Sequence, residues 1–385
     1  MKGAAYWQRS AARPATKWAA NSANPSEAIM AGNEKLDLEK ARRVAQGVMG
    51  DVASALHIQL CYIGDRLGIF KAMMNAGPLS IDALAAASGV DRRYLREWAA
   101  AMVAAQYVDY DKSAQTYFLA PEYAAALADD QSPFFVASYF QTAQAAAAIA
   151  PRVAQAFKDG GGVDQSEYPP SLFEAFERNS GTRYRHKLVR KWLPAMPQVV
   201  QALDHGGIMA DVGCGGGRAA VMIAQAFPNA RAVGVDVHPE SIARARELAA
   251  HRGVADRVTF EVGDAGSLPA EKFDFVSTFD VVHDAVDPAG LMRSIHNAIK
   301  RDGTYLVQEI NVSDQLTENI STLGKLGYSI STLYCLATSL AHEGAGLGIG
   351  MGEAKARELA ASAGFSQFRR LPIKDEVAIL FEIRP

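Results

Sequence analysis

A glycine-rich stretch at positions 211–217 constrains the fold of this chain more than any other feature, and it reads Asp-Val-Gly-Cys-Gly-Gly-Gly. The apolar run 208–210 precedes it, and a helical pattern follows from Ala219 to Phe227. A strand, a glycine turn and a helix in this order form a loop that binds nucleotide cofactors, because glycines let the backbone approach the ligand. The stretch therefore predicts a cofactor site where a strand ends.

Two classes of cofactor use such a loop, and the positions of the glycines separate them. The dinucleotide fingerprint G-x-G-x-x-G has its third glycine on the first turn of the helix, whereas Arg218 stands at that position here. The pattern present is D-x-G-x-G-x-G, in which Asp211 ends the strand. A carboxylate at this place suits a cationic ligand such as the sulfonium and amino group of S-adenosylmethionine (SAM), and it would repel a pyrophosphate.

The segments around this loop alternate between strand-like and helical patterns. Strands are predicted at 208–210, 232–236, 258–262, 273–277, 304–308 and 377–382, and helices at 241–250 and 353–363. This alternation predicts an α/β fold, a mostly parallel sheet with helices on both faces. The second strand ends in Asp236, which lies 23 residues after Gly213 (236 − 213). That spacing is close to the roughly 20 residues expected for a carboxylate that binds ribose hydroxyls.

The glycine loop and the acids that follow it resemble the motifs of class I SAM-dependent methyltransferases, over about residues 185–385. The resemblance implies a Rossmann-like methyltransferase sheet, with SAM as the cofactor and methyl donor and no metal. The residues that it implies for cofactor binding are Asp211, Gly213, Gly215, Gly217, Asp236, Val237, Asp264, Ala265, Phe279 and Asp280.

The front half of the chain has the pattern of a winged helix. A long helical pattern runs from 38 to 70, and Ser80 and Asp91 are expected to cap two further helices, at 81–87 and 92–106. Two short strands around a polar turn are then predicted at 107–110 and 116–119. Helix, turn, helix and a two-stranded wing together predict a winged-helix domain.

A winged helix suggests DNA binding, but the sequence argues against it. A helix that reads a groove needs polar side chains that reach base edges, whereas the second helix here is apolar from 98 to 105. The net charge of −3 also gives no reason to expect a nucleic-acid or membrane partner. The domain order resembles that of plant-type O-methyltransferases and of a bacterial winged-helix methyltransferase group with mycobacterial members. Those proteins use the domain to dimerise and to wall the substrate pocket, which implies a homodimer here.

The predicted domain boundaries follow from these patterns. Residues 37–125 are assigned to the winged-helix dimerisation domain, 126–184 to a helical connector and 185–385 to the methyltransferase domain. Residues 1–36 are predicted to be a disordered tail or a start-site overcall, with Met30 as the alternative start. The first 26 residues are basic, rich in Ala and Ser and free of acids, a composition that also resembles a transit peptide.

His283 has the sequence context of a general base, because it follows the fourth strand and ligands of such sheets bind beyond the carboxyl ends of strands. A phenol has a pKa of about 10 and a thiol of about 8.5, so a histidine with a pKa of about 6.5 suits either acceptor. The run Val282-His283-Asp284 resembles the catalytic His-Asp of plant-type O-methyltransferases, although Ala285 replaces their usual tryptophan. Asp284 or Glu309, at the end of the fifth strand, is expected to orient the imidazole.

A long connection at 313–350 follows the fifth strand, and glycine stands at every second position from 344 to 350. This composition predicts a helical lid with a glycine hinge, or alternatively an insertion that contacts a partner subunit. The segment 331–335 resembles the bacterial winged-helix methyltransferases specifically. The expected substrate-pocket residues are Tyr328 and Tyr334, together with Tyr139 of the connector.

These observations predict a cytoplasmic SAM-dependent methyltransferase that acts on a small molecule. Some relatives in the bacterial group act on small thiols, which favours S-methylation of a thiol or sulfide, and O-methylation of a phenol or other aromatic hydroxyl is the alternative. A SAM-sensing winged-helix regulator and a binding protein without activity are alternatives from other classes. The three cysteines are scattered, which fits a reducing compartment. The sequence has no run of about 18 apolar residues, so no membrane-spanning helix is expected.

Overall fold

The computed structural model describes residues 30–31 and 34–385 of the chain. The predictions for residues 1–29 therefore lie outside the described residues. The chain forms two compact units, of which one ends at Ala55 and the other is Leu56–Pro385. The predicted boundaries at 37–125, 126–184 and 185–385 stay a prediction.

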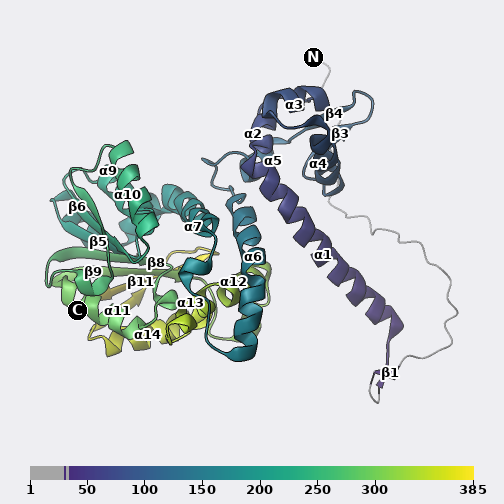
Figure 1. The fold of residues 1–385 in the computed structure, drawn as a ribbon. Coiled ribbons are helices and arrows are strands. Elements are labelled where there is room, and N and C mark those ends of the chain that lie inside the picture. The colour runs from purple at the N-terminus through teal and green to yellow at the C-terminus, as the bar shows by residue number, and fades with distance from the viewer. Residues whose placement is uncertain (1–29, 32–33) are drawn as a thin grey trace. The chain divides into compact units, whose positions relative to one another are not determined.

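The first elements are β1 (Met30–Ala31), β2 (Glu34–Lys35) and the long helix α1 (Leu38–Arg66) (Figure 1). The winged-helix region continues with α2 (Ile69–Met73), α3 (Ile81–Ser88), α4 (Arg92–Ala104), β3 (Asp109–Asp111), β4 (Thr116–Phe118) and α5 (Pro121–Leu127). The helices before the large sheet are α6 (Ser138–Asp159), η1 (Gln165–Glu167), α7 (Pro170–Arg183), the π-helix η2 (Tyr184–Trp192), η3 (Leu193–Ala195) and α8 (Pro197–Asp204).

The large sheet and its helices follow in alternation. The strands are β5 (Ile208–Val212), β6 (Arg231–Asp236), β7 (Val258–Val262), β8 (Phe273–Phe279), β9 (Ile299–Ile310), β10 (Gln367–Arg370) and β11 (Ala378–Arg384). The helices are α9 (Arg218–Ala226), α10 (Pro239–His251), α11 (Pro288–Ala298), α12 (Thr322–Leu333), α13 (Cys335–Ala341) and α14 (Gly352–Ser362). Short 3-10 turns are η4 (Ala265–Ser267), η5 (Val282–Asp284), η6 (Leu316–Asn319) and η7 (Gly348–Met351).

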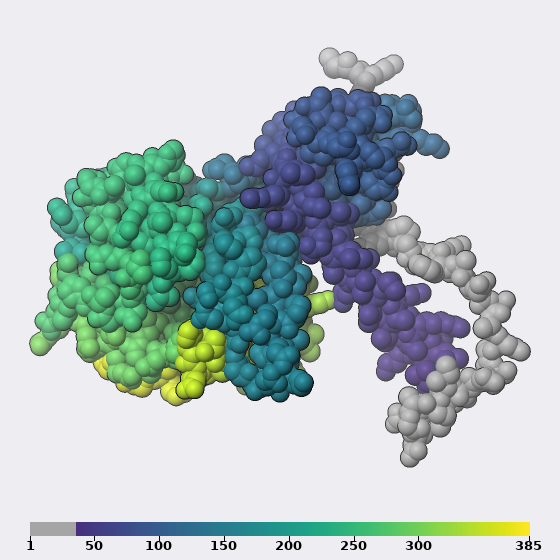
Figure 2. Space-filling view, viewed as in Figure 1, coloured from purple at the N-terminus to yellow at the C-terminus, as the bar shows by residue number. Residues whose placement is uncertain are grey.

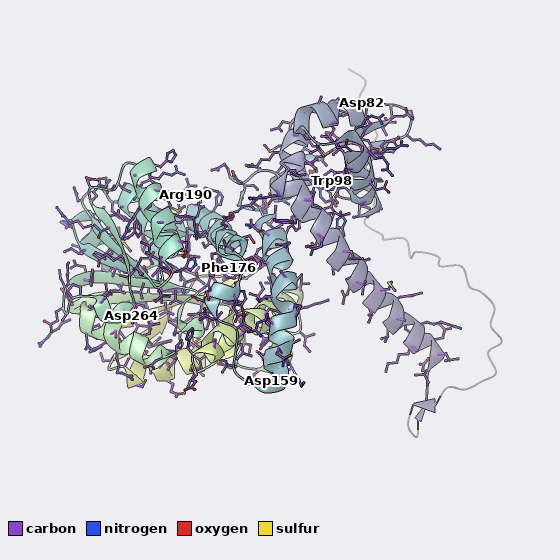
Figure 3. All side chains as sticks on the ribbon, viewed as in Figure 1. Asp82, Trp98, Asp159, Phe176, Arg190 and Asp264 are labelled. Carbon is purple, nitrogen blue, oxygen red and sulfur yellow. The ribbon has the colours of Figure 1, made fainter. Side chains whose placement is uncertain are left out.

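The winged-helix prediction is confirmed in its local detail. The hydroxyl of Ser80 accepts a hydrogen bond from the backbone of α3, and the carboxylate of Asp91 accepts two from α4. Strands β3 and β4 pair as an antiparallel wing. Trp98 of α4 (Figure 3) is buried in the core of this region, and its indole nitrogen donates to the backbone oxygen of Leu60 at 2.9 Å.

Two of the three arginines of α4 are paired with neighbouring acids. Arg92 pairs with Asp82, and Arg93 pairs with Glu97 at 2.6 Å. The positive charge on this helix is therefore partly neutralised, while a helix that binds nucleic acid needs unpaired cations for the phosphates. These pairs add to the case against a DNA-binding regulator.

The large sheet confirms the predicted Rossmann-like α/β fold. Its seven strands lie in the order β10-β11-β9-β8-β5-β6-β7. Strands β5 to β9 are parallel, whereas β11 pairs antiparallel with both β9 and β10. The sequence pattern missed β10, because this edge strand is polar and mostly exposed and so lacks the apolar alternation of a half-buried strand.

Two hydrophobic cores cover the two faces of this sheet. Successive strand residues point to opposite faces, so Met209 of β5 packs in one core and Ala210 in the other. The first core contains residues of η2, α8, α9 and α10, and the second contains residues of α11 and α14. The helices on both faces bury the strands (Figure 1). Because strands β5 to β9 are parallel, their carboxyl ends lie at one edge of the sheet.

The predicted lid region, 313–350, contains the helices α12 and α13, and positive φ angles occur at Gly346 (58°) and Gly348 (57°). Its glycine-rich end is therefore a turn between α13 and η7. Its action as a lid stays a prediction. None of the helices in the described ranges is both long enough and apolar enough to span a bilayer.

Candidate active site

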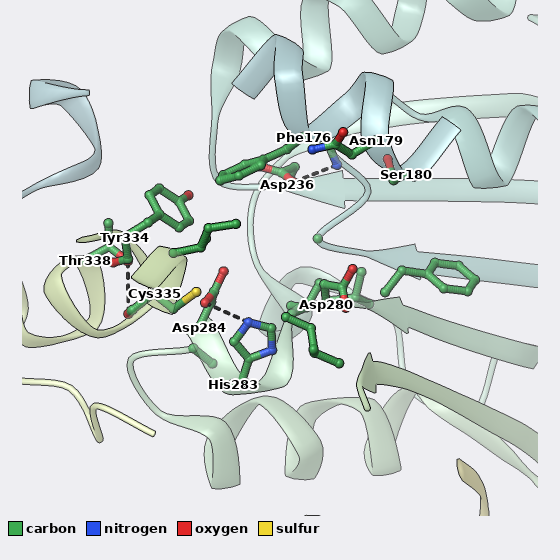
Figure 4. A pocket seen from close by; sticks show the side chains of 18 of the residues that line it. Phe176, Asn179, Ser180, Asp236, Asp280, His283, Asp284, Tyr334, Cys335 and Thr338 are labelled. Atoms are coloured by element: carbon green, nitrogen blue, oxygen red, sulfur yellow. Dashed lines mark hydrogen bonds and ion pairs between the residues drawn. The ribbon is translucent and has the colours of Figure 1, made fainter. Parts of the chain in front are cut away.

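A cavity of about 1030 Å³ opens at the carboxyl ends of the parallel strands. Ligand sites typically enclose about 300–1,000 Å³, so this cavity can hold a cofactor together with a small acceptor. The glycine loop after β5, the acids after β6 and β7, and the segment after β8 form one part of its wall. Helices α7, α12 and α13 contribute the other part, and Figure 4 shows His283 on one side and Asp236 with Phe176 on the other.

The glycine loop has the geometry of a ligand cradle. Gly213 and Gly215 both line the cavity with positive φ angles, 68° and 51°. A Cβ on Gly213 would lie 2.5 Å from a side-chain carbon of Val281, whereas the space at Gly215 is open. The backbone conformation at both positions therefore favours glycine and leaves the loop accessible to a ligand.

Gly217 corrects one expectation, because it does not line the cavity. Its φ is 71°, and a Cβ there would lie 2.5 Å from the ring of Phe260 and 2.8 Å from Ala245. This glycine lets the start of α9 pack closely against Phe260 and Ala245. It therefore supports the glycine loop through packing and not through contact with the cavity.

Asp236 ties the end of β6 to the glycine loop. One of its carboxylate oxygens accepts from the backbone of Gly215 at 2.8 Å, and the other accepts from the backbone of His238 at 2.9 Å. Each oxygen has a second lone pair, so the carboxylate can still accept from ribose hydroxyls. Val237 and Asp264 line the same wall, the latter after β7.

Of the other residues expected at the cofactor, three line the cavity and Asp211 does not. Ala265, Phe279 and Asp280 line the cavity, as predicted. Asp211 does not, because its side chain is buried below the loop, where it accepts from the hydroxyl of Ser277 at 2.9 Å. Burial raises the pKa of Asp211 to about 7, so a cation bound in the loop above would favour its ionised form.

The candidate base His283 is buried and held by Glu309. One ring nitrogen, Nδ1, is hydrogen-bonded to Glu309 Oε2, and Glu309 Oε1 accepts from the backbone of Val282 at 3.0 Å. With Nδ1 donating to the carboxylate, Nε2 is left to accept a proton. Glu309 does not line the cavity, whereas His283 does, so Glu309 orients the ring from behind.

Asp284 and Cys335 lie on the cavity side of this imidazole (Figure 4). Asp284 Oδ1 is 3.1 Å from His283 Nε2, but the contact lacks hydrogen-bond geometry and this buried oxygen accepts no hydrogen bond from the described residues. Burial lowers the pKa of His283, but Asp284 and Glu309 more than offset it and raise that pKa well above its usual value. Burial and the charge of Asp284 raise the pKa of the Cys335 thiol to about 12, so this thiol is protonated at neutral pH.

The ligand atoms of His283, Asp284 and Cys335 lie within 4.8 Å of one another, the spacing of a possible metal site. A metal there would occupy the imidazole nitrogen that a general base needs. The two roles therefore exclude each other, and a chelator distinguishes them.

Part of the cavity wall is apolar and aromatic. Tyr139 and Tyr334 line it as expected, together with Phe173, Phe176 and Ile330. The hydroxyl of Tyr334 accepts from the side-chain amide of Gln165 at 3.1 Å, which fixes the ring at the wall.

Tyr328 corrects another expectation. It is not among the residues that line the cavity, and its hydroxyl accepts from the side-chain amide of Asn319 at 3.2 Å. On helix α12 it lies two positions from Ile330, which does line the cavity, so the helical period turns Tyr328 to a different direction.

The sequence patterns missed several residues of the wall. Arg183, at the end of α7, lines the cavity and pairs with Asp280 at 2.5 Å. Glu177 of the same helix lines it too and is held by Arg244 at 2.6 Å. No local motif marks either residue, because α7 joins the cofactor edge only through tertiary packing.

The comparisons with known families agree with this geometry. Residues 203–369 match the profile of a methyltransferase domain, and residues 54–129 match a Rv2258c-like winged HTH domain. Residues 203–369 of this chain are thus a methyltransferase domain. The open space at Gly215 and the free lone pairs of Asp236 fit SAM, the cofactor that a methyltransferase domain implies.

Similar structures share the fold of this chain along nearly its whole length. The mitomycin 7-O-methyltransferase has a TM-score of 0.66 and 22% sequence identity, and the match covers 90% of this chain and 99% of that one. Human N-acetylserotonin methyltransferase, solved in complex with SAM, has a TM-score of 0.61 and 21% identity, over 92% and 99% of the two chains.

Curated relatives match over a shorter region. The ubiquinone biosynthesis O-methyltransferase of Neisseria meningitidis is 34% identical over 109 residues, which are 28% of this chain and 45% of that protein. The ajmaline N-methyltransferase of Rauvolfia serpentina is 26% identical over 136 residues, 33% of this chain and 46% of that protein. The chain thus spans less than half the length of these relatives.

Replacing Asp236 with alanine should weaken binding of the demethylated product S-adenosylhomocysteine (SAH). The substitution removes the acceptor expected for the ribose and the hydrogen bond that ties the glycine loop to the end of β6, at a cost on the order of 1–3 kcal/mol of binding free energy. Calorimetry measures the loss. Unchanged SAH affinity in a folded Asp236→Ala protein would contradict the assigned cofactor edge.

Proposed function

We propose that this methyltransferase moves the methyl group of SAM to a thiol or hydroxyl of a small, largely apolar molecule, with His283 as the general base. When bound, SAM supplies an electrophilic methyl group on a sulfonium. The chain's own part is to bind both molecules in one cavity, to exclude water and to accept the proton that the acceptor loses.

The observation that carries this proposal is the buried Glu309–His283 pair at the cavity wall. Glu309 holds Nδ1, and Nε2 lies beside the carboxylate of Asp284, so two acceptors face each other without a proton donor when the imidazole is neutral. An O–H or S–H group placed there would supply the missing donor and would be positioned to lose its proton. A thioether has no such proton and would gain nothing from this arrangement.

The nature of the acceptor atom is left between two candidates. The sequence resemblance favours sulfur, since some members of the bacterial group act on small thiols. O-methyltransferases among the relatives and similar structures favour a phenol or other aromatic hydroxyl. The His283–Glu309 pair supports both equally, and the apolar wall supports an acceptor with a hydrophobic body in either case.

Product analysis by mass spectrometry separates these candidates. Purified protein is incubated with SAM that carries a deuterated methyl group and with matched pairs of acceptors, each an aromatic thiol and the phenol of the same shape. We expect the label on one member of a pair. If neither the thiols nor the phenols carry the label at any neutral or mildly basic pH, the result would contradict the proposed activity.

We also propose a homodimer, supported by the exposed apolar side of helix α1 (purple in Figure 2). Its exposed apolar side chains recur at helical spacing and are Val44, Val48, Met49, Val52, Leu56 and Ile63. Val48 is 58% exposed and Leu56 68% exposed, which is unusual for a monomer because such surface gains free energy when it is buried. A second copy of the chain is the proposed partner.

Replacing Val48 and Val52 with glutamate should dissociate this dimer. Charges at the interface would repel each other across the twofold axis and would be costly to bury. Light scattering measures the molar mass of the full chain. Arg43→Glu is the control, because the helical period puts Arg43 on the opposite side of α1. A monomeric parent protein, or a dimer that survives both glutamates, would contradict the proposal.

A further inference from the structure

Helix α12 presents apolar side chains to the cavity. The residues by which this helix lines the cavity are all leucine, isoleucine or glycine, namely Leu323, Gly324, Leu326, Gly327 and Ile330. Leu326 and Ile330 follow Leu323 by three and seven positions, the spacing at which side chains share one face of a helix. Leu323, Leu326 and Ile330 together form the apolar stripe of α12.

The apolar stripe becomes more buried towards the candidate base. Leu323 is 43% exposed and Leu326 is 38% exposed, whereas Ile330 is half-buried. Cys335, which begins α13, is 4% exposed, and its sulfur lies within 4.8 Å of a ring nitrogen of His283 (Figure 4). The stripe therefore leads from solvent along the cavity wall towards the place where a proton is to be removed.

The apolar stripe is held in position by contacts on a neighbouring side of α12. The hydroxyl of Ser331 accepts from the backbone of Ile349 in η7 at 2.9 Å. A Cβ on Gly327 would lie 2.3 Å from the side chain of the same isoleucine, so the glycine allows α12 and η7 to pack closely. The stripe is thus a fixed part of the wall.

Half-exposed leucines in a ligand cavity favour an apolar ligand, because their surface gains free energy when an apolar group covers it. Leu323 and Ile330 are seven positions apart (330 − 323), which is about 10 Å along the helix axis. This distance is longer than one aromatic ring, and a hydrocarbon chain can follow it. Since the stripe lines the same cavity as His283, its occupant is expected to be part of the acceptor.

The outer end of the apolar stripe is polar. Glu318, Asn319 and Ser321 precede α12 and also line the cavity, and Glu318 is exposed. A chain that follows the stripe outwards therefore ends near a carboxylate, which would repel a second negative charge. An uncharged chain end fits this rim better than an anionic one.

We propose that the acceptor carries an uncharged, unbranched hydrocarbon chain, which lies along the apolar stripe while the reacting hydroxyl or thiol lies at His283. The proposal rests on the proposed function and narrows its substrate class to molecules with a small reactive head and an apolar chain. The chain keeps the same contacts in the ground state and the transition state, so it should lower KM more than it changes kcat.

Acceptors that differ only in chain length test this proposal. The probes are phenols and thiophenols with an unbranched alkyl chain, from methyl to octyl, opposite the reacting group. Each is used below the concentration at which it self-associates. We expect kcat/KM to rise by up to about fourfold for each methylene that the stripe buries, mainly through KM. A carboxylate at the end of the octyl chain should remove part of this gain.

Leu323→Asn combined with Leu326→Asn should remove most of the preference for a long chain. The ratio of kcat/KM between the octyl and the methyl acceptor should fall by about tenfold, because two apolar contacts are lost. Both leucines are part-exposed, so the fold should tolerate the change. Leu316→Asn is the matched control, since Leu316 is 73% exposed and does not line the cavity. Calorimetry on the SAH-saturated protein compares binding of the same chains without catalysis.

Equal kcat/KM along the chain series, or a gain that survives both asparagines, would overturn the proposal. A lower molar mass of the double variant in light scattering would overturn it as well, because the stripe would then be an interface with a second copy of the chain. If no acceptor is methylated but longer chains still bind more tightly in calorimetry, the proposed function fails and this inference stands.

Discussion

His283→Ala should lower kcat by about 10²–10⁴-fold for an acceptor that must lose a proton, with SAH affinity nearly unchanged. The substitution removes the imidazole between Glu309 and the cavity and leaves the glycine loop and Asp236 intact. Stopped assays give kcat, and calorimetry gives the affinity for SAH. Wild-type kcat at neutral pH in this variant would mean that His283 is structural or that the acceptor needs no base.

The direction in which the rate changes with pH tests whether His283 is a general base. Because Asp284 and Glu309 raise the pKa of His283 above its usual 6.5, a higher pH is needed to bring the imidazole into the neutral form that can act as a base. We therefore expect kcat/KM to increase as the pH rises through this raised pKa. In His283→Ala the rate should recover at high pH as solvent ionises the acceptor, and it should recover at lower pH for a thiol than for a phenol.

Two controls separate the base from other roles of the same cluster. Glu309→Gln keeps the size of the side chain and removes its charge. The pH profile of this variant should therefore show a lower pKa for His283 than the wild-type profile does. The variant should also lose less kcat than His283→Ala. A chelator should leave the rate unchanged, because the imidazole nitrogen is needed for the proton. Loss of activity on chelation, restored by a divalent metal, would assign His283, Asp284 and Cys335 as metal ligands instead.

Gly213→Val should abolish measurable SAH binding, a loss of about 100-fold or more. A β-branched residue at a φ of 68° costs roughly 1–3 kcal/mol, and its Cβ would also lie 2.5 Å from the side chain of Val281. Relief of that contact would move the loop or the segment that leads to His283. Calorimetry and a thermal denaturation curve together report the loss of binding and the change in stability.

Gly253→Val is the matched control for this substitution. Gly253 has a φ of 67°, nothing lies within 4 Å of its Cβ position, and it does not line the cavity. The control therefore carries the same conformational cost without the contact and without the ligand. Equal SAH binding by both variants would show that the loop after β5 is not the cofactor site.

Much of the fold was predictable from the sequence because its signals are local. The loop at 211–217 is continuous, and the caps Ser80 and Asp91 act within three residues of their own positions. Parallel strands share one edge, so acids that end β6 and β7 had to meet the glycine loop there. The cofactor wall follows from order along the chain and from this rule.

The rest of the site depends on contacts between distant segments. Asp280 and Arg183 are 97 positions apart, and nothing near Arg183 in the sequence indicates its partner. Cys335 was expected only as part of the lid, but the turn between α12 and α13 brings it beside His283. Both candidate orienters of the imidazole contact it, Glu309 at Nδ1 and Asp284 near Nε2, which spacing alone did not reveal.

A crystal structure of the full chain with SAH and a bound acceptor tests the central claim most directly. The account predicts SAH on the wall of Gly213, Gly215 and Asp236, with its sulfur turned towards His283. The reacting atom of the acceptor should lie between that sulfur and Nε2, close to the roughly 3–3.5 Å spacing that reacting groups need once the methyl group is in place. SAH bound elsewhere, or a sulfur that faces away from His283 with the acceptor out of reach of Nε2, would contradict the account.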